Sequence, residues 1–347
     1  MKLLILTQKV DKQDDVLGFM HRWIAQFAAQ CEAVTVVCLF EGVHTLPKNV
    51  RVFSLGKEKG VGRLGFVWNF FRIIWRERAV YDAVFVHMNQ VYVLLGGLLW
   101  RALGKRVALW YAHGAVSASL RVAEKMVDRV FTSTESGFRL PSSKVRVVGQ
   151  GIDTDYFCPA QEVVRDGFKI VVVGRISPVK DYETLVLAVE KLRGEIEGLS
   201  VEIIGGAGLP DHVAYLEALQ KMVSEKKLEG IVNFVGPRSN DDILQRLQQA
   251  DLFVNTSLTG SLDKAVLEAM SCGVVTLTCN EALREVFGPY TNQLMFEKKN
   301  GDGLAEKIRF MEAMGFEERR KVGMRLREIV VGYHGLERFV RKIISLI

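Results

Sequence analysis

The sequence predicts two α/β domains, each built on a doubly wound parallel sheet of the Rossmann-like kind. Short runs rich in Val, Ile and Leu alternate with longer segments of helical periodicity along the whole chain. The runs are apolar at consecutive positions, which is typical of strands covered by helices on both faces. A length of 347 residues suits two medium-sized domains better than one. The carboxyl ends of the two sets of strands are expected to face a common cleft.

The first half of the chain supplies the elements of the first sheet. Apolar β-branched runs predict strands near residues 3–7, 35–39, 83–87, 106–110, 129–132 and 144–148. Amphipathic segments between them predict helices near residues 18–30, 61–78, 92–103 and 116–127.

The same alternation begins again at residue 169. Strands are expected near residues 169–173, 200–205, 232–235, 252–255, 274–278 and 293–296. Helices are expected near residues 181–190, 211–227, 240–249, 264–270 and 303–314. The polar stretch 151–167 has no clear period and is expected to be the linker. We therefore predict a first domain over 1–158, a second over 159–332, and a C-terminal helix in 333–347 that packs back on the first.

Composition limits the classes of function. Residues 1–160 contain 21 Lys and Arg against 13 Asp and Glu, so the basic excess lies in the first half. A basic surface attracts nucleic acid, an anionic membrane or an anionic substrate. The chain has no zinc-finger spacing, no RNP-like aromatic motif and no long basic tract, so no nucleic-acid partner is expected.

Cysteines and apolar runs indicate the compartment. The five cysteines are odd in number and none has CxxC spacing, which favours free thiols in a reducing cytoplasm. The opening run reads as a strand and is too short for a signal peptide. The longest apolar stretch, 91–100, is about half of the roughly 20 residues that a membrane span needs. We expect a cytoplasmic protein without a transmembrane helix.

The first chemical signal is the segment 171–181, in which a strand ends at Gly174 and a helix starts near Asp181. Arg175 and Lys180 place two cations on this strand-to-helix loop, where a guanidinium fork, an ammonium and a helix N-terminus can bind phosphate oxygens. Two solvated loop charges are the alternative. The pairing, the glycine and the placement favour phosphate.

The second signal is the segment 255–273, which runs from a strand through a small polar loop into a helix. Backbone N–H groups from Gly260 to Asp263 can receive phosphate or sugar oxygens. Glu268 lies one turn after Lys264, and an ion pair on a solvent-facing helix would be its ordinary role. Its apolar neighbours predict a buried helix, however, in which a carboxylate needs partners such as ribose hydroxyls.

Together these segments resemble the retaining glycosyltransferases of the GT-B fold, family 4 (glycosyl transferases group 1). The resemblance rests on Gly174-Arg175 with Pro178-Val179-Lys180-Asp181, and on Leu267-Glu268-Ala269-Met270-Ser271-Cys272-Gly273. It continues in the segments 149–153, 203–208, 232–236 and 250–254, and covers most of residues 144–278. It implies a first domain that binds the acceptor and a second domain that binds the nucleotide sugar.

The resemblance also implies roles for single residues. Arg175 and Lys180 would bind the donor diphosphate, and Glu268 the ribose hydroxyls. His113 would lie near the transferred sugar, although a strand-end loop residue is the ordinary interpretation of a lone histidine. Gly18 loosely matches the family's first glycine-containing loop. The expected donor-binding residues are Gly18, Gly174, Arg175, Lys180, Gly260, Ser261, Leu262, Lys264 and Glu268, and the expected catalytic residues are His113, Arg175, Lys180 and Asp263.

One position departs from the family pattern. The family has two glutamates eight positions apart, and Gly260 stands where the first is expected. Asp263 and Lys264 are the nearby charged candidates, and we predict that Asp263 contacts the donor sugar instead. The alternative is that Asp263 only caps the following helix.

The segment 57–78 combines Phe and Trp with six Lys and Arg residues. A basic aromatic helix can lie in a membrane interface. A helix packed on the sheet with a basic outer face explains it equally well.

We therefore expect a metal-independent enzyme that needs no cofactor and transfers a sugar from a nucleotide-diphosphate donor, with UDP and GDP both open, to a glycan or lipid-linked glycan. It would be peripheral on the inner face of the cell membrane. The rival class is a non-catalytic sugar-nucleotide-binding or scaffold protein of the same fold. A sugar-nucleotide epimerase is a poorer match, because it would lack the Leu-Glu-Ala-Met segment in this context. A Rossmann dehydrogenase is a poorer match still, because this sequence contains no GxGxxG motif after its opening strand.

Overall fold

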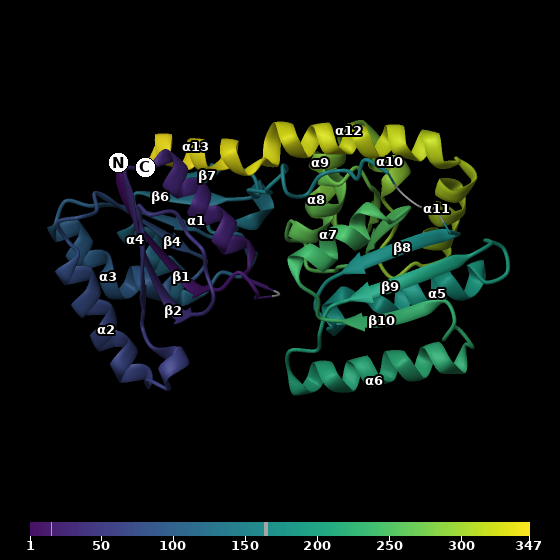
Figure 1. Ribbon diagram of the computed structural model, residues 1–347, viewed down its shortest axis with the longest axis horizontal. Coiled ribbons are helices and arrows are strands. Elements are labelled where there is room, and N and C mark those ends of the chain that lie inside the picture. Colours follow the sequence, from purple (N-terminus) through teal and green to yellow (C-terminus); the bar gives the residue numbers. More distant parts are fainter. Residues whose placement is uncertain (15, 163–165) are drawn as a thin grey trace. The chain divides into compact units, whose positions relative to one another are not determined.

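The computed structural model describes residues 1–14, 16–162 and 166–347, which form two compact units (Figure 1). The first unit consists of Met1–Asp153 together with His334–Ile347, and the second of Thr154–Tyr333. The sequence predicts these boundaries after residues 158 and 332. Residues 163–165 of the expected linker lie outside the described residues.

The first unit contains a seven-stranded sheet in which every pairing is parallel. Its order is β3-β2-β1-β4-β5-β6-β7. The strands are β1 (Lys2–Val10), β2 (Ala33–Glu41), β3 (Val50–Ser54), β4 (Ala83–His87), β5 (Arg106–Trp110), β6 (Arg129–Thr132) and β7 (Val145–Val147). The strand order reverses between β1 and β4, which is the doubly wound arrangement predicted from the sequence.

Helices cover both faces of this sheet. They are α1 (Phe19–Gln30), α2 (Arg63–Arg76), α3 (Val91–Ala102), α4 (Ala118–Met126) and α13 (Leu336–Leu346). Leu3 and Ile5 of β1 belong to the core beneath α1 and α13, whereas Leu4 and Leu6 belong to the core beneath α2, α3 and α4. Successive side chains of a strand point to opposite faces, so continuous apolar runs are required where both faces are buried.

The C-terminal helix α13 completes the first core by packing beside α1 (Figure 1). Trp23 of α1 packs against Trp110 and Phe339, with ring centroids 5.5 and 4.3 Å away, and these two rings also contact each other (5.1 Å). Its indole N–H donates to the carbonyl of Gly151 (2.7 Å). The first unit consists of two segments of the chain, and this buried aromatic cluster joins α13, in the second of them, to α1 and to Gly151 near the end of the first.

The second unit contains a five-stranded parallel sheet in the order β10-β9-β8-β11-β12. Its strands are β8 (Phe168–Val173), β9 (Leu199–Ile204), β10 (Val232–Gly236), β11 (Leu252–Asn255) and β12 (Val275–Thr278). Its helices of eight or more residues are α5 (Tyr182–Leu192), α6 (Pro210–Glu225), α7 (Asn240–Gln248), α8 (Lys264–Ser271), α11 (Gly301–Ala313) and α12 (Phe316–His334). The order reverses between β8 and β11, and in open α/β sheets the carboxyl ends of the strands at such a reversal are where ligands bind.

Three elements differ from the prediction. Residues 293–296 were expected to be a strand, but Thr291–Leu294 forms the short helix α10 and only Met295 bridges to Thr278. The edge strand β3 was not predicted because its mostly half-exposed residues lack a continuous apolar run. The long helix α12 was also missed, since charged residues fill its first two turns.

None of the helices in the described part of the chain combines the length and apolar character needed to cross a bilayer. Each of the five cysteines is a free thiol.

Buried His334 gives the protein a pH-dependent stability. Burial lowers the pKa of His334 to about 4, from an ordinary value of 6.5. The folded state therefore keeps the imidazole neutral, whereas the unfolded chain takes up a proton below pH 6.5. At pH 5.5 this difference should cost about 1.4 kcal/mol of unfolding free energy relative to pH 7.5. Urea unfolding of wild type and His334→Gln at both pH values should show the smaller loss in the variant, and equal losses would contradict the assignment.

Candidate donor-binding site

The end of β8 is held close to the end of β9 by main-chain contacts. The Gly174 N–H donates to the Ile204 carbonyl (2.9 Å), and the Ile176 N–H donates to the Gly206 carbonyl (3.0 Å). Gly205 has a φ of 149°, and a Cβ atom there would lie 1.9 Å from the Gly174 carbonyl oxygen. Only glycine fits such an approach, so Gly205 fixes the path of the loop that carries the two candidate phosphate ligands.

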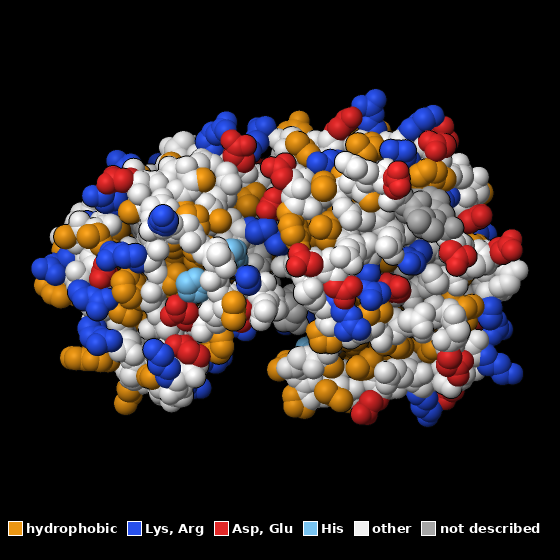
Figure 2. Space-filling model, in the orientation of Figure 1, with side chains coloured by type: hydrophobic (Ala, Val, Ile, Leu, Met, Phe, Trp, Pro, Cys, Tyr) orange, Lys and Arg blue, Asp and Glu red, His pale blue; other side chains and the backbone are white. Residues whose placement is uncertain are grey.

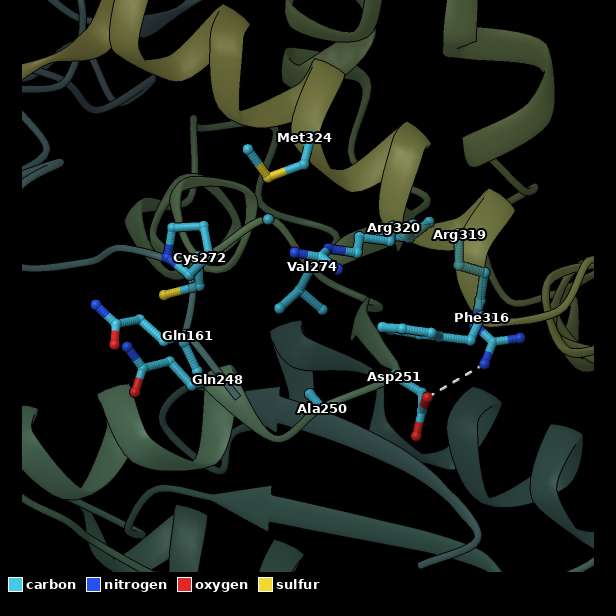
Figure 3. Close-up of a pocket in the computed structure, with 14 residues that line it drawn as sticks. Gln161, Gln248, Ala250, Asp251, Cys272, Val274, Phe316, Arg319, Arg320 and Met324 are labelled. Carbon is cyan, nitrogen blue, oxygen red and sulfur yellow. Dashed lines mark hydrogen bonds and ion pairs between the residues drawn. The ribbon is translucent and has the colours of Figure 1, made fainter. Parts of the chain in front are cut away.

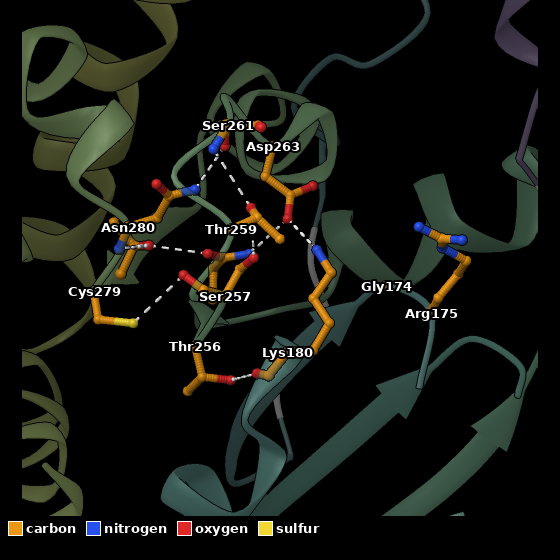
Figure 4. Close-up of polar contacts among 12 residues, drawn as sticks. Gly174, Arg175, Lys180, Thr256, Ser257, Thr259, Ser261, Asp263, Cys279 and Asn280 are labelled. Carbon is orange, nitrogen blue, oxygen red and sulfur yellow. Dashed lines mark hydrogen bonds and ion pairs between the residues drawn. The ribbon is translucent and has the colours of Figure 1, made fainter. Parts of the chain in front are cut away.

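Arg175 and Lys180 lie on this loop in different surroundings. The Arg175 side chain is exposed, and no described residue bonds to its guanidinium; Figure 4 shows it apart from the polar network. Lys180 ends a short 3-10 turn before α5, and its ammonium forms an ion pair with Asp263. Both side chains of this pair are only 16% exposed. One cation is therefore open to solvent, whereas the other already has an anionic partner.

Asp263 links the β8 loop to the neighbouring strands. Its Oδ2 accepts from Lys180 and from the Asn255 amide (3.0 Å), which lies at the end of β11 (Figure 4). Asn255 in turn accepts from the Thr278 hydroxyl (3.0 Å) at the end of β12. This polar network therefore ties together the carboxyl ends of three adjacent strands at the β8/β11 reversal.

The network rules out the capping role of Asp263 that was open from the sequence. Asp263 precedes α8, but within the described chain its carboxylate makes no hydrogen bond to the first turn of that helix. Its Oδ2 is used by Lys180 and Asn255, and no described residue bonds to its Oδ1.

The loop before α8 explains why a glycine stands at position 260. Gly260 has a φ of 66°, in the left-handed region that a glutamate occupies only at a cost of about 1–2 kcal/mol. Ser261 is held by Asn280, whose amide donates to the Ser261 carbonyl (2.7 Å), and Leu262 is buried. On α8, the side chains of Lys264 and Glu268 are half-buried beside buried apolar neighbours.

A second pair of contacts holds the two loops together. The Leu258 N–H donates to the Val179 carbonyl (2.9 Å), and the Thr256 hydroxyl donates to the Lys180 carbonyl (2.5 Å). Tyr182 reaches back from α5 and donates its hydroxyl to the Gly174 carbonyl (3.1 Å). Burial raises the pKa of Tyr182, and the Asp263 carboxylate adds to the rise, so the phenol stays a neutral donor.

Gly18 and His113 belong to the first unit. Gly18 is buried directly before α1, in the loop that follows β1. His113 is exposed in the loop after β5, and its Nδ1 accepts from the Ala115 N–H (3.1 Å). Both residues thus follow the carboxyl ends of strands in one sheet.

Sequence reasoning found the two loops but missed the residues that connect them. Asn255, Thr278 and Asn280 follow apolar strand runs and are all buried. Polar residues at consecutive strand ends were the available signal, but only the strand order shows that β11 and β12 are neighbours. Among the described residues, no group of three or more His, Cys, Asp or Glu side chains is arranged to hold a metal ion.

Residues 159–328 match the family model described as glycosyl transferases group 1. They hold the β8 and β11 loops and all of the candidate residues of the second unit. Over this segment, just under half of the chain, the protein is similar to the glycosyl transferases group 1 family.

The curated relatives of this chain are of moderate similarity. The chain is 28% identical over 196 residues to a D-inositol 3-phosphate glycosyltransferase of Salinispora tropica, covering 50% of this chain and 38% of that protein. It is 27% identical over 156 residues to a GDP-mannose-dependent alpha-(1-6)-phosphatidylinositol monomannoside mannosyltransferase of Mycobacterium tuberculosis, covering 40% and 39%. The chain thus spans about two fifths of the length of these relatives.

Solved structures resemble the fold of the whole chain. HepE of Anabaena, in complex with UDP, has a TM-score of 0.79 at 18% identity and is matched over 99% of both chains. Sucrose-phosphate synthase of Thermosynechococcus elongatus has a TM-score of 0.78 at 16% identity, over 100% of this chain and 98% of that one. The two parallel-sheet α/β domains are therefore those of the GT-B fold.

The group 1 segment also contains a cavity of about 250 Å³ away from these loops (Figure 3). Asp251 and Val274, which line it, directly precede β11 and β12, so the cavity lies at the amino ends of the strands. Arg319 pairs there with Asp251 (3.2 Å). None of the candidate donor-binding residues lines this cavity.

The close approach at Gly205 can be tested by adding one methyl group. Gly205→Ala should destabilise the protein by about 2–5 kcal/mol, because a side chain is strained at this φ and meets the Gly174 carbonyl. Urea unfolding measures the loss. Gly208→Ala is the matched control, since a Cβ there meets nothing within 4 Å. Equal stabilities of the two variants would show that the β8 and β9 ends are not so closely packed.

Proposed function

We propose that this protein transfers a sugar from a nucleotide-diphosphate donor to a glycan or lipid-linked glycan, with retention of anomeric configuration. The observation that carries the proposal is the placement of Arg175 and Lys180 at the carboxyl end of β8, beside the strand-order reversal of a group 1 domain. Relatives named for inositol phosphate and phosphatidylinositol mannoside acceptors support a phosphorylated or lipid-linked acceptor.

In this proposal the second unit stabilises the leaving group. Cleavage of the bond between the anomeric carbon and the diphosphate leaves negative charge on phosphate oxygens. Arg175 and Lys180 would stabilise that charge, together with backbone N–H groups near Gly174, Ser261 and Leu262. The donor diphosphate would compete with Asp263 for the Lys180 ammonium.

The remaining candidate residues would bind the rest of the donor. Glu268 would accept hydrogen bonds from the ribose hydroxyls, and Lys264 would lie beside it on α8. His113 and Gly18, from the first unit, would approach the transferred sugar and the phosphates. The acceptor hydroxyl would attack on the face that the diphosphate leaves.

Asp263 would replace the family's first glutamate as an acceptor for sugar hydroxyls. Its Oδ2 is held by Lys180 and Asn255, while its Oδ1 has no partner among the described residues. The Asn255 amide would keep Oδ2 in place when a diphosphate takes Lys180, and a carboxylate fixed at one oxygen loses little freedom on binding a hydroxyl through the other.

The rival proposal is a protein of the same fold that binds a sugar nucleotide without turnover. Gly260 supports this rival, because the family's first glutamate, which lies beside the donor sugar, is missing at that position. The left-handed backbone of Gly260 also disfavours a glutamate there. Tight binding of a nucleotide sugar with neither transfer nor hydrolysis would make this rival the better account.

We also propose that the protein works as a peripheral protein at the inner face of the cell membrane. A lipid-linked acceptor is confined to that surface, and an anionic bilayer suits the basic excess of residues 1–160.

Removal of either candidate phosphate ligand should weaken nucleoside-diphosphate binding. Arg175→Ala and Lys180→Ala should each raise the dissociation constant of UDP or GDP by about 10- to 150-fold, as expected when a charge-assisted hydrogen bond is lost. Calorimetry on folded variants measures this, after thermal-shift screening identifies which base binds. Lys221→Ala, an exposed lysine of α6, is the control. Unchanged affinity in both variants would remove the phosphate assignment.

Neutralising Asp263 should separate binding from transfer. Asp263→Asn frees Lys180 and removes a negative charge near the phosphates, so nucleoside-diphosphate affinity should stay equal or rise by up to about tenfold. Transfer should fall, because an amide is a weaker acceptor for sugar hydroxyls. Calorimetry and turnover on the same preparation give both quantities. An affinity loss like that of Lys180→Ala would show instead that Asp263 only positions the lysine.

A further inference from the structure

Helix α2 of the first unit has two apolar faces. Phe70, Ile73 and Ile74 are buried in the core beneath the sheet. A second stripe on the outside is formed by Leu64, Trp68, Phe71 and Trp75, of which Leu64 is 88% exposed and Trp68 72% exposed. The spacing of four, three and four residues places these four side chains along one side of the helix.

A helix that only covers a sheet needs one apolar face. Large side chains exposed together are uncommon on monomeric proteins and mark a surface that contacts a partner or a membrane. Periodicity alone left the role of this helix open between core packing and membrane contact. In the structure, the core is packed against Phe70, Ile73 and Ile74, whereas the side chains of the outer stripe remain exposed.

The segment that carries the outer stripe is rich in basic side chains. Residues 57–78 contain six Lys and Arg but only two Glu. Glu77 is buried and bound by Arg51 and Arg76, and Glu58 accepts from the Ser54 hydroxyl. In Figure 2, blue and orange side chains alternate over the surface formed by α2.

Two of the basic residues are placed directly beside the apolar ones. The Arg78 guanidinium lies 4.3 Å from the centre of the Trp75 ring. Arg72 is exposed immediately after Phe71. Tryptophan rings with flanking arginines suit the boundary between lipid headgroups and acyl chains, where one end of the residue is apolar and the other is wet.

We infer that the outer stripe of α2 docks this protein on an anionic lipid bilayer, with Trp68 and Trp75 in the interface. The inference rests on the proposed function and names the surface that brings the enzyme to a lipid-linked acceptor. A second copy of the chain is a poorer occupant, because pairing the stripe with itself would bring like charges together. An anionic bilayer can contact the apolar stripe with its acyl chains and the neighbouring Lys and Arg side chains with its headgroups.

The tryptophans make this docking directly measurable. The chain has five, and Trp23, Trp100 and Trp110 are at most 2% exposed. A fluorescence change on adding vesicles therefore reports Trp68 and Trp75. Vesicles of phosphatidylglycerol and phosphatidylcholine should shift the emission to shorter wavelength, and brominated acyl chains should quench it. Binding should weaken as salt rises, because the Debye length falls to about 8 Å at physiological ionic strength.

Charge introduced into the stripe should abolish this binding. Leu64→Glu/Trp68→Glu should weaken vesicle sedimentation by at least about tenfold, since it removes buried apolar area and adds like charge to the surface. Phe310→Glu is the matched control, because Phe310 is an exposed aromatic residue on α11 of the second unit. UDP and GDP binding in solution should be the same in all three proteins.

The outcomes separate the two proposals. No sedimentation of wild type with anionic vesicles at low salt, or full binding by Leu64→Glu/Trp68→Glu, would overturn the docking inference while leaving nucleotide binding intact. A concentration-dependent dimer that the double substitution dissociates would assign the stripe to a second copy and also overturn it. Vesicle binding without any UDP or GDP binding would overturn the proposed function instead.

Discussion

The ion pair between Lys180 and Asp263 is the contact on which the site in the second unit depends. An ammonium that is mostly shielded from water needs an anionic partner, and Asp263 supplies it from a loop 83 residues away in the sequence. Through Asn255 and Thr278 the same carboxylate joins the ends of β8, β11 and β12. Because Asp263 is used in this way, its carboxylate does not cap the first turn of α8 in the described part of the chain.

In the proposed function, this pairing would divide the work between the two cations. Arg175 is open to solvent and would meet an approaching diphosphate first, while Lys180 would exchange one anion for another. The net cost of moving Lys180 from a carboxylate to a phosphate is smaller than that of ordering a free lysine, because its side chain is already partly fixed. A glutamate three positions earlier could not form this pair from the left-handed backbone of Gly260 without strain.

Much of the fold could be predicted because buried parallel strands leave a local signal. Several interior strands, among them β1, β4, β8 and β11, contain continuous apolar runs, and each is predicted from the sequence. The edge strand β3 has Arg51 and Ser54 in a half-exposed segment, so no run distinguishes it from a loop. The sequence predicts a strand where the short helix α10 lies, because a short apolar run such as Leu294, Met295 and Phe296 is compatible with either a strand or a helix. In the site, Arg175 and Lys180 were found from their own loop. The pairing of Lys180 with Asp263 could not be predicted, because it depends on β8 and β11 being neighbours in the sheet, and the local sequence does not show the strand order.

Helix α2 shows the same limit of local sequence information in another form. Its composition fits a core helix and an interfacial helix equally well, because both require apolar residues at helical spacing. The deciding quantity is how many apolar side chains the neighbouring sheet can cover, which depends on tertiary packing. The sheet covers Phe70, Ile73 and Ile74 and leaves Leu64, Trp68 and Trp75 exposed. Leaving two tryptophans in water is unfavourable by about 25 cal/mol for each Å² of apolar surface, and this cost supports the inference that the outer stripe has a partner.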